Sequence, residues 1–304
     1  MKDPAANIIA RYELKAKPNY WQAHIENVRD YVGKLLDGVT ITEKDGAVGN
    51  WQPLNFDSRI FGLSMGTIGW WAAEDWYNAN RPALLNEILT DADGAGIDHL
   101  TLRVSASDNP AIEWAEDAGF RTVTIFTGFA MELRNAEENS RRSCIRAAEP
   151  LDGMVLREIT AEAFSSGTRF HNDTGLADGA EKLHQEWIDN CLKGEAADCL
   201  MVAEVSGEVV GYISFMIDQL SVEKLGQARA SIGLFAVRNA CRGKGIGSKL
   251  LMAVCSALKE RGIERVEVGT EATNYNAINV YAKAGFKVVQ SSVTMHRWRS
   301  RTIT

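Results

Sequence analysis

The sequence predicts an α/β fold: a mixed, mostly antiparallel sheet flanked by helices, preceded by a partial copy of the same fold. Three observations predict it. Segments with helical and strand-like hydrophobic spacing alternate along the C-terminal half, which is typical of α/β sheets. Three strand-like segments precede them, and the turn residues Ser206-Gly207 join the first two as a hairpin. The chain also matches itself at an offset of 166 residues.

The internal match aligns residues 96–123 with residues 262–289 without a gap. Nine of the 28 aligned positions are identical, and the triplet Ala118-Gly119-Phe120 recurs as Ala284-Gly285-Phe286. Chance supplies scattered identities, whereas an ungapped match that keeps a triplet indicates a duplicated structural unit. We therefore expect both copies to follow the order helix, strand, helix, strand.

The elements of the second copy follow from residue spacing. Apolar residues alternate in the strands, and apolar residues three and four apart mark two helices, which are followed by Gly262 and Gly285 as suitable helix ends. The predicted strands cover residues 199–205, 209–217, 231–237, 265–268 and 286–298, and the predicted helices cover residues 248–261 and 276–284.

The domain organisation follows from the repeat and from one polar segment. Residues 134–143 (RNAEENSRRS) contain a single Ala and no other apolar side chain, which is typical of a linker. We expect a helical extension over residues 1–50, with a helix near residues 21–36. A degenerate copy then covers residues 51–134, and the complete copy covers residues 144–304.

Composition and charge restrict the function classes. The 304 residues carry 33 basic and 40 acidic side chains, so the net charge of −7 provides no positive field for nucleic acid or an anionic membrane. No apolar stretch approaches the roughly 18 residues that span a bilayer. The five cysteines form no C-x-x-C pair and no metal-ligand spacing, which argues against disulfides and a metal centre. We expect a cytoplasmic protein without a nucleic-acid, membrane or metal partner.

A glycine-rich loop follows the third strand of the second copy. Residues 238–248 read RNACRGKGIGS and lead into a helix. Glycines let backbone N–H groups approach a ligand closely, and the start of a helix attracts phosphate. Arg238, Arg242, Lys244 and Lys249 add local positive charge. The spacing matches neither a dinucleotide-binding fingerprint nor a P-loop, so the loop is either a pyrophosphate cradle or a flexible turn.

Two motifs in this order resemble the coenzyme A signature of the GNAT N-acetyltransferase superfamily. They are Arg242-x-x-Gly245-x-Gly247 after a strand, and Asn274-x-x-Ala277-x-x-x-Tyr281-x-x-x-Gly285-Phe286 downstream. The resemblance covers roughly residues 144–298 and implies a GNAT sheet that binds acetyl-CoA. It implies a pyrophosphate on the loop amides and a pantetheine arm along residues 232–237, where that strand leaves its neighbour. The implied cofactor contacts are Phe235, Ala236, Val237, Arg242, Gly243, Lys244, Gly245, Ile246, Gly247, Ser248 and Asn274.

The same resemblance implies that Tyr281 is the general acid, and the chemistry suits a tyrosine. When an amine attacks a thioester, a thiolate leaves, and a phenol within hydrogen-bond reach can protonate it. A tyrosine on a helix is more often a half-buried core aromatic, and its place in the motif favours the catalytic role here. In the first copy the equivalent residue is Ala115, and residues 76–81 (WYNANR) replace the glycine loop. The first copy is therefore expected to keep the fold without the chemistry.

Further segments resemble the TDP-fucosamine acetyltransferase group within this superfamily, which N-acetylates an amino sugar on a nucleotide carrier. They include Thr168-Arg169-Phe170, the helix at residues 183–190 and the ending at residues 295–298. The resemblance implies a nucleotide-linked amino sugar as the acceptor. Arg169 is the candidate contact to that acceptor, and an ordinary surface arginine in a loop is the equal alternative.

The general base stays open. His171 in a loop and Glu204 on a strand are candidates, although such residues more often face solvent. The tryptophans at positions 51, 70, 71 and 76 could stack on a sugar, but core packing is the favoured interpretation.

Three functions are compatible with these observations. The leading prediction is an acetyl-CoA-dependent N-acetyltransferase that moves an acetyl group to the primary amine of a small acceptor. A regulatory module that binds acyl-CoA without turnover is the second possibility. Such a module would be expected to lose the general acid, as the first copy has lost it at Ala115. Acetylation of protein or peptide amines usually needs an open groove, whereas the long N-terminal half favours a small acceptor. A homodimer is compatible with the sequence.

Overall fold

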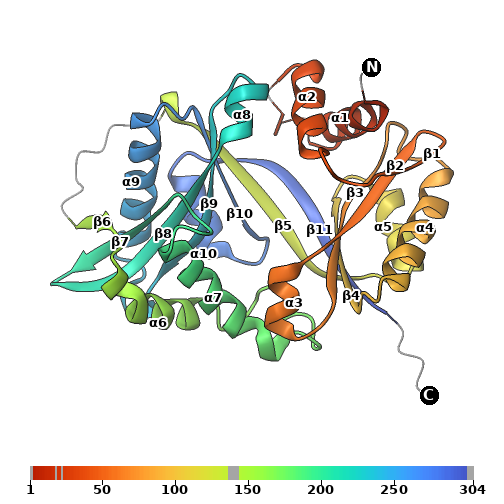
Figure 1. Ribbon diagram of the computed structural model, residues 1–304. Coiled ribbons are helices and arrows are strands. Elements are labelled where there is room, and N and C mark those ends of the chain that lie inside the picture. The colour runs from red at the N-terminus through yellow and green to blue at the C-terminus, as the bar shows by residue number, and fades with distance from the viewer. Residues whose placement is uncertain (1–2, 18, 22, 136–143, 300–304) are drawn as a thin grey trace. The chain divides into compact units, whose positions relative to one another are not determined.

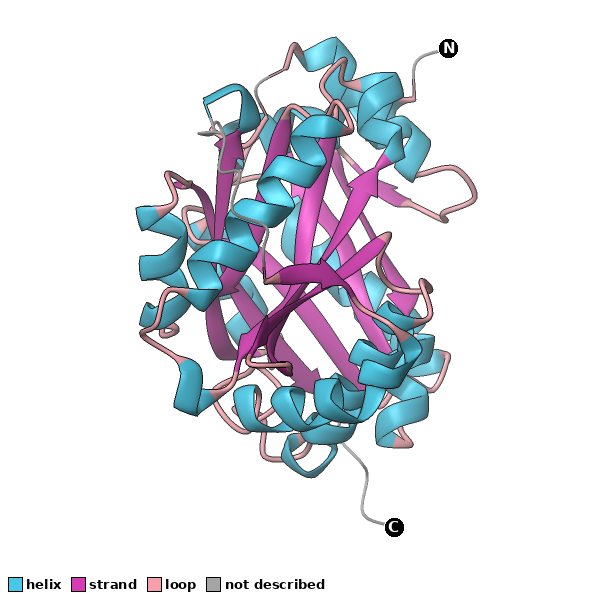
Figure 2. Cartoon of the chain, turned by 90° about the vertical axis from the view of Figure 1, so that its left-hand side faces the viewer, coloured by secondary structure: helices cyan, strands magenta, loops and turns pink. Residues whose placement is uncertain are grey.

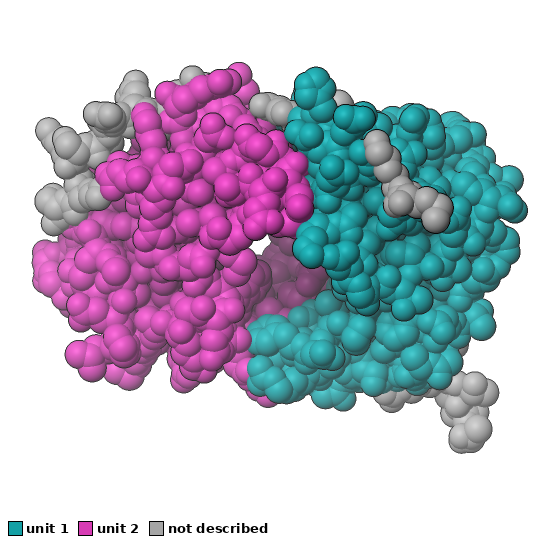
Figure 3. All heavy atoms as spheres, turned by 45° about the horizontal axis from the view of Figure 1, so that its top comes forward, with its two compact units in different colours: residues 1–126, 289–304 teal, residues 127–288 magenta. Residues whose placement is uncertain are grey.

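The computed structural model of the chain describes residues 3–17, 19–21, 23–135 and 144–299 (Figure 1). The chain divides into two compact units, which Figure 3 shows in separate colours. Unit 1 comprises residues 1–126 and 289–304, and unit 2 comprises residues 127–288. No helix within the described ranges is long and apolar enough to cross a membrane.

Unit 1 opens with two helices that pack on each other, α1 (Pro4–Ala16) and α2 (Ile25–Leu35). The elements that follow are β1 (Thr42–Lys44), β2 (Ala47–Pro53), α3 (Asn55–Phe61), β3 (Met65–Ala73), α4 (Asn80–Gly94), β4 (His99–Ser105), α5 (Asn109–Asp117) and β5 (Arg121–Glu132). The strand order is β1-β2-β3-β4-β11, where β11 (Lys287–Trp298) is the last strand of the chain. Strands β3 and β4 pair in parallel, and the other neighbours pair antiparallel.

Unit 2 has the strand order β5-β10-β9-β8-β7-β6. Its strands are β6 (Ile145–Ala147), β7 (Cys199–Val205), β8 (Glu208–Asp218), β9 (Arg229–Val237) and β10 (Arg265–Glu271). Its α-helices are α6 (Gly153–Ala163), α7 (Ala180–Leu192), α8 (Gln219–Lys224), α9 (Ile246–Glu260) and α10 (Tyr275–Lys283). Short 3₁₀ turns cover Leu133–Asn135, Pro150–Asp152, Ala177–Gly179 and Asn239–Cys241.

Helices cover both faces of the sheet in unit 2 (Figure 2). Ile213 of β8 belongs to the core that packs under α9, whereas its neighbour Tyr212 belongs to the core under α6 and α7. Successive strand residues point to opposite faces, so both faces are apolar and both need a helical layer. The predicted mixed α/β sheet flanked by helices is therefore confirmed.

The internal repeat is a structural repeat. The bounds of α4 and α9, of β4 and β10, of α5 and α10, and of β5 and β11 each differ by 166 residues at both ends. The bounds of β3 and β9 differ by 164 residues. The connection from strand to helix is thus two residues longer in the second copy, over residues 238–245 rather than 74–79.

The two compact units do not follow the halves predicted from the repeat, because each copy sends its last strand into the other unit. The end of β5 lies in unit 2, and the residue that follows it, Leu133, donates from its backbone N a 2.7 Å hydrogen bond to Glu264 O. Strand β11 lies in unit 1 from Val289 onward and pairs with β4. A sequence match cannot reveal this exchange, because the exchange depends on which neighbouring strands β5 and β11 pair with. Most of the predicted linker, residues 136–143, lies outside the described residues.

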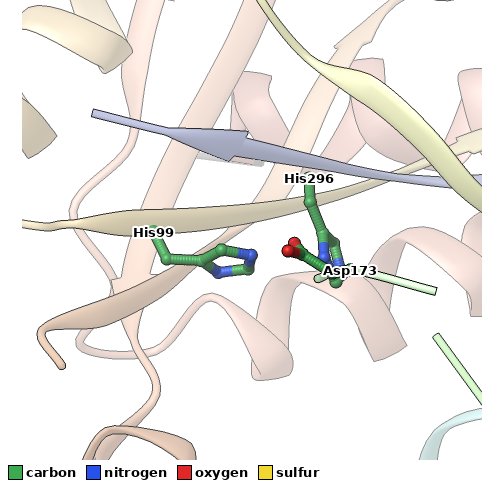
Figure 4. A group of neighbouring side chains, drawn as sticks. All are labelled: His99, Asp173 and His296. Carbon is green, nitrogen blue, oxygen red and sulfur yellow. The ribbon is translucent and has the colours of Figure 1, made fainter. Parts of the chain in front are cut away.

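Different side chains secure the two exchanged strands. In unit 2, Arg265 Nη1 of β10 lies 3.0 Å from Glu132 Oε1 of β5. In unit 1, His99 of β4 packs against His296 of β11, with ring centroids 4.5 Å apart; Figure 4 shows these two side chains. The His99 ring centroid also lies 5.0 Å from that of Trp298 on the same strand as His296. Residue 99 is the repeat equivalent of residue 265, and residue 298 is that of residue 132. The same position thus carries an ion pair in one unit and an aromatic contact in the other.

Candidate active site

The candidate site of the second copy begins where β9 separates from β10. The two strands pair in parallel only from Arg229–Arg265 to Ser231–Glu267. From Ile232 onward, within the described chain, the edge of β9 that faced β10 has no ladder partner. Unpaired backbone N–H and C=O groups need hydrogen bonds from elsewhere. The expected splay of residues 232–237 is thus present.

A β-bulge lies at this point of β9. The pairing with β8 shifts between Ile213 and Phe215. Ser214 Oγ accepts a hydrogen bond of 2.9 Å from Leu234 N. A Cβ on Gly233 would lie 2.8 Å from that hydroxyl, so a larger residue here would displace the Ser214 side chain from its hydrogen bond. Bulges re-aim a strand and are frequent beside active sites.

The first copy contains the same bulge. Asn50 stands where Ser214 stands, at an offset of 164 residues, and its Oδ1 accepts a 2.9 Å hydrogen bond from Trp70 N. Gly69 likewise stands in the place of Gly233, close to the Asn50 side chain. The bulge is therefore part of the duplicated unit, and sequence reasoning missed it because the two-residue insertion shifts the strand out of the 166-residue register.

The glycine loop is open around its backbone. Gly243 and Gly245 both have a φ of +77°, and a Cβ added at either would meet nothing within 4 Å. Such a φ favours glycine. Gly245 is the N-cap of α9 and supplies no side-chain cap, so the first amides of the helix have no side-chain acceptor there. An open set of amides at a helix start fits a phosphate group.

Basic side chains surround this loop. Arg242 Nε donates to Val237 O at 3.1 Å, while Lys244 and Lys249 form no ion pair with any described residue. Helix α6 fixes the beginning of the loop: Arg238 pairs with Glu158 at 2.8 Å. Asn239 N also donates to Glu162 Oε1 at 2.7 Å. The two glutamates were not predicted from the sequence, since nothing in the spacing links residues 77 or more positions apart.

Tyr281 lies in the core behind the loop. It is 4% exposed, and its ring centroid lies 5.5 Å from Phe129 and 6.3 Å from Phe235. Burial raises the pKa of the Tyr281 hydroxyl, so the phenol stays protonated. Among the described residues the hydroxyl has no hydrogen-bond partner. Phe235 also covers the loop, because a Cβ on Gly247 would lie 3.4 Å from its ring. Tyr281, Phe235 and Gly247 therefore meet as one group.

Asn274 has a structural role of its own. It is the N-cap of α10: Oδ1 accepts from Ala277 N at 3.2 Å, and Nδ2 donates to Thr270 Oγ1 at 3.0 Å. Both ends of the side-chain amide are thus engaged within the chain. A contact between Asn274 and the cofactor stays a prediction.

Residues predicted on the acceptor side gather at the connection between α6 and α7. The Arg169 guanidinium lies 4.5 Å from the Phe170 ring, and His171 Nδ1 lies 2.7 Å from Thr168 Oγ1. Nearby, the buried His184 stacks on Phe164. Burial lowers the pKa of His184 to about 4, so this imidazole is neutral at physiological pH.

Two other predicted candidates have structural partners. The Glu204 carboxylate pairs with Arg146, which also holds Asp152. Among the tryptophans, Trp71 is buried and donates from Nε1 to Arg81 O at 2.9 Å, and Trp51 donates to Asp91 at 2.6 Å. These contacts agree with packing rather than sugar stacking for the two rings.

Known proteins match this region in sequence and fold. Residues 156–286, which carry the bulge, the glycine loop and Tyr281, match the acetyltransferase (GNAT) family. The matched segment, residues 156–286, is therefore a GNAT domain. The prediction of a GNAT domain in the second copy is thereby confirmed, and the repeated element bounds show two copies of this fold in tandem.

Individual relatives extend the comparison. The spore coat polysaccharide biosynthesis protein SpsD of Bacillus subtilis is 30% identical over 153 residues, 49% of each chain. The mycothiol acetyltransferase of Propionibacterium freudenreichii is 27% identical over 116 residues, 38% of this chain and 34% of that protein. The chain thus spans half or less of the length of these two relatives. A GCN5-related N-acetyltransferase from Sphaerobacter thermophilus has the same fold, with a TM-score of 0.63, 18% identity and coverage of 98% and 92% of the two chains.

Proposed function

We propose that this chain is an acetyl-CoA-dependent N-acetyltransferase whose active site lies in the second copy. One observation carries the proposal. The unpaired edge of β9, the open glycine loop at the start of α9 and the protonated Tyr281 form one continuous group through Phe235. Each part suits a different part of a thioester donor, and the first copy lacks both the glycines and the tyrosine.

The residues present fit coenzyme A. Backbone amides of residues 243–248 would hold the pyrophosphate, with Lys244 and Lys249 supplying positive charge that no carboxylate in the described chain neutralises. The free edge of β9 would pair with the amides of the pantetheine arm, as one strand pairs with another. Acetyl-CoA, when bound, supplies the acetyl group as a thioester.

Tyr281 would act as the acid. Its proton is retained because burial raises its pKa, and its hydroxyl is not committed to another residue. As the acceptor amine forms its bond to the acetyl carbon, the carbon–sulfur bond breaks and the sulfur leaves with the electron pair. The Tyr281 hydroxyl would give its proton to that sulfur. We assign no residue to the deprotonation of the amine.

The acceptor is proposed to be a small amine carried on a sugar. The relative SpsD is named for spore coat polysaccharide biosynthesis, and the Arg169 guanidinium lies over the buried Phe170 ring, which helps to position this cation. If a nucleotide carries the sugar, Arg169 is the candidate for its diphosphate, since a guanidinium binds phosphate oxygens in pairs.

A panel of amines tests the proposal. Nucleotide amino sugars, free amino sugars, amino acids, polyamines and peptides are each incubated with acetyl-CoA and the chain, and free thiol and acetylated amine are measured. We expect both products in equal amounts with an amino sugar. Coenzyme A binding without thiol release from any amine would favour the regulatory module. Release with peptides alone would favour protein amines.

Arg169→Ala then tests the acceptor side. The loss of a charge-assisted hydrogen bond costs roughly 1.5 to 3 kcal/mol, so KM for the acceptor should rise by about tenfold or more while KM for acetyl-CoA is unchanged. Arg157→Ala is the matched control, because Arg157 is an exposed arginine that pairs with Asp189 on the surface of α6 and α7. A shift in acetyl-CoA kinetics alone would place Arg169 on the donor side.

A further inference from the structure

Two positions that keep the cleft open in the second copy are charged in the first. Gly247 is the second residue of α9, and Asn274 caps α10. At the 166-residue offset the first copy has Arg81 as the second residue of α4 and Asp108 as the cap of α5. Arg81 Nη2 lies 2.8 Å from Asp108 Oδ2, and Nη1 lies 3.2 Å from Oδ1. Both side chains are 0% exposed.

The ion pair is enclosed by further groups of unit 1. Arg81 Nη1 donates to Trp76 O at 3.0 Å, and Nη2 donates to Trp71 O at 3.3 Å. The guanidinium carbon lies 4.8 Å from the Trp71 ring centroid and 5.6 Å from that of Trp114. Trp71 is the repeat equivalent of Phe235, at the 164-residue offset. The space beside the bulge in the first copy is therefore filled by side chains.

The N-terminal extension completes this enclosure. Tyr12 of α1 donates from its hydroxyl to Asp108 Oδ2 at 2.9 Å, and its ring lies 5.6 Å from the Arg81 guanidinium carbon. Tyr12 itself is buried. Helix α1 also packs against β2 and β3. By order and packing α1 corresponds to α6 of the second copy, which packs against β8 and β9, so in the first copy the helix at this place contributes a tyrosine to the site equivalent to the coenzyme A cleft.

Among the described residues of the second copy, no side chain bridges the same two helix starts. Gly247 has no side chain, and the Asn274 amide turns to Thr270 instead. A buried arginine and carboxylate are costly to separate, because each would be left charged without a partner. The Asp108 carboxylate would in addition repel a phosphate at this place. Coenzyme A could enter the first copy only if the Arg81–Asp108 ion pair were broken and the phosphate were placed beside a carboxylate, and both changes are unfavourable.

We propose that Arg81, Asp108 and Tyr12 plug the cofactor cleft of the first copy, so that the chain binds one coenzyme A, in the second copy. The claim that the second copy binds coenzyme A rests on the proposed function. In the first copy, helix α1 closes the degenerate site. Unit 1 then serves as a scaffold that has no cofactor of its own.

Native mass spectrometry with coenzyme A tests the count. We expect one molecule per wild-type chain and none with Gly247→Asp, while Gly94→Asp in α4 retains one. Gly94 is a suitable control because a Cβ there meets nothing within 4 Å and its repeat equivalent is the acidic Glu260. Two coenzyme A molecules per wild-type chain, or one that still binds to the Gly247→Asp variant, would contradict the proposal that the first copy is closed. No binding by the wild type would refute the proposed function and leave the first copy closed, as inferred.

Tyr12→Phe tests the role of α1 without any cofactor. The variant loses one hydrogen bond to a buried carboxylate, so amides of residues 4–16 should exchange with deuterium roughly tenfold faster. Tyr77→Phe, at an exposed tyrosine of the same unit, should leave their exchange unchanged. Equal exchange of α1 in the Tyr12 variant and the wild type would show that Tyr12 does not hold the helix in the cleft.

Discussion

Tyr281 differs from the other buried tyrosines in what its hydroxyl touches. Tyr12 donates to Asp108 and Tyr212 shares a 2.6 Å hydrogen bond with Thr160, whereas the Tyr281 hydroxyl has no partner in the described chain. Although Tyr281 is 4% exposed as a residue, its hydroxyl oxygen is not fully enclosed, so a ligand can reach it. A ligand sulfur near this hydroxyl would satisfy it.

Tyr281→Phe should therefore impair catalysis and leave binding intact. The variant removes the proton donor but keeps the ring that packs against Phe129 and Phe235, so kcat should fall by roughly 10²- to 10⁴-fold with little change in KM for acetyl-CoA. Steady-state thiol release measures both constants. Tyr77→Phe is the control, and a Tyr281 variant as fast as the wild type would assign the acid elsewhere.

His184 gives unit 2 a pH-dependent stability. Burial lowers its pKa from 6.5 to about 4 in the folded chain, so its contribution is complete above pH 6.5 and is lost as the pH falls toward 4. The free energy of unfolding should be lower by about 2 kcal/mol at pH 5 than at pH 7.5 for this residue alone. Urea unfolding of the wild type and of His184→Gln at both pH values measures this pH dependence of the free energy of unfolding. The difference between the two pH values should be smaller in the variant, and an equal difference would contradict the shift.

At the scale of elements, the glycine loop and α9 form the donor site. Gly247 has an ordinary φ and lies against Phe235, while Gly245 has a φ of +77°. A side chain at Gly245 would strain the backbone as well as fill the site, so only Gly247 separates binding from folding. Gly247→Asp adds a negative charge to the predicted phosphate site.

Gly247→Asp should lower the affinity for coenzyme A steeply with little loss of stability. The carboxylate would repel the pyrophosphate, and its Cβ needs only a small adjustment of the Phe235 ring. Calorimetric titration measures the affinity, and thermal unfolding confirms the fold. Unchanged affinity in a folded variant would remove the loop from the site.

Much of each element was predictable from the sequence, because hydrophobic spacing sets where a helix or strand can bury a face. The helix predicted at residues 276–284 is α10, and the Ser206-Gly207 turn has positive φ at both residues. The bulge at Ser214 and the cap at Asn274 were not predicted as such, because each depends on one hydrogen bond that leaves no periodic signal. The Arg81–Asp108 pair was missed because it joins two helices through tertiary contact.

At the scale of the whole molecule, the exchanged strands make each unit dependent on both copies. Strand β5 begins in unit 1 and ends in unit 2, and β11 begins in unit 2 and continues in unit 1. The predicted catalytic copy, residues 144–304, thus lacks the strand beside β10 and would expose an unpaired edge.

Separate production of the two copies tests this dependence. Residues 144–304 alone should fail to unfold cooperatively and should aggregate, whereas co-produced fragments 1–135 and 144–304 should purify together as one folded complex. Circular dichroism during heating and size-exclusion chromatography measure the two outcomes. A soluble 144–304 fragment that melts cooperatively would mean that the exchange is not needed for folding.

Hydrogen–deuterium exchange of the wild-type chain with and without coenzyme A tests the central claim, that the donor binds in the second copy between β9 and the start of α9. The account predicts slower exchange of amides at residues 232–248 on binding. It predicts no change at the equivalent first-copy segment, residues 68–82, where Arg81 and its partners fill the cleft. Slower exchange at residues 68–82, or protection at neither segment despite binding, would contradict it.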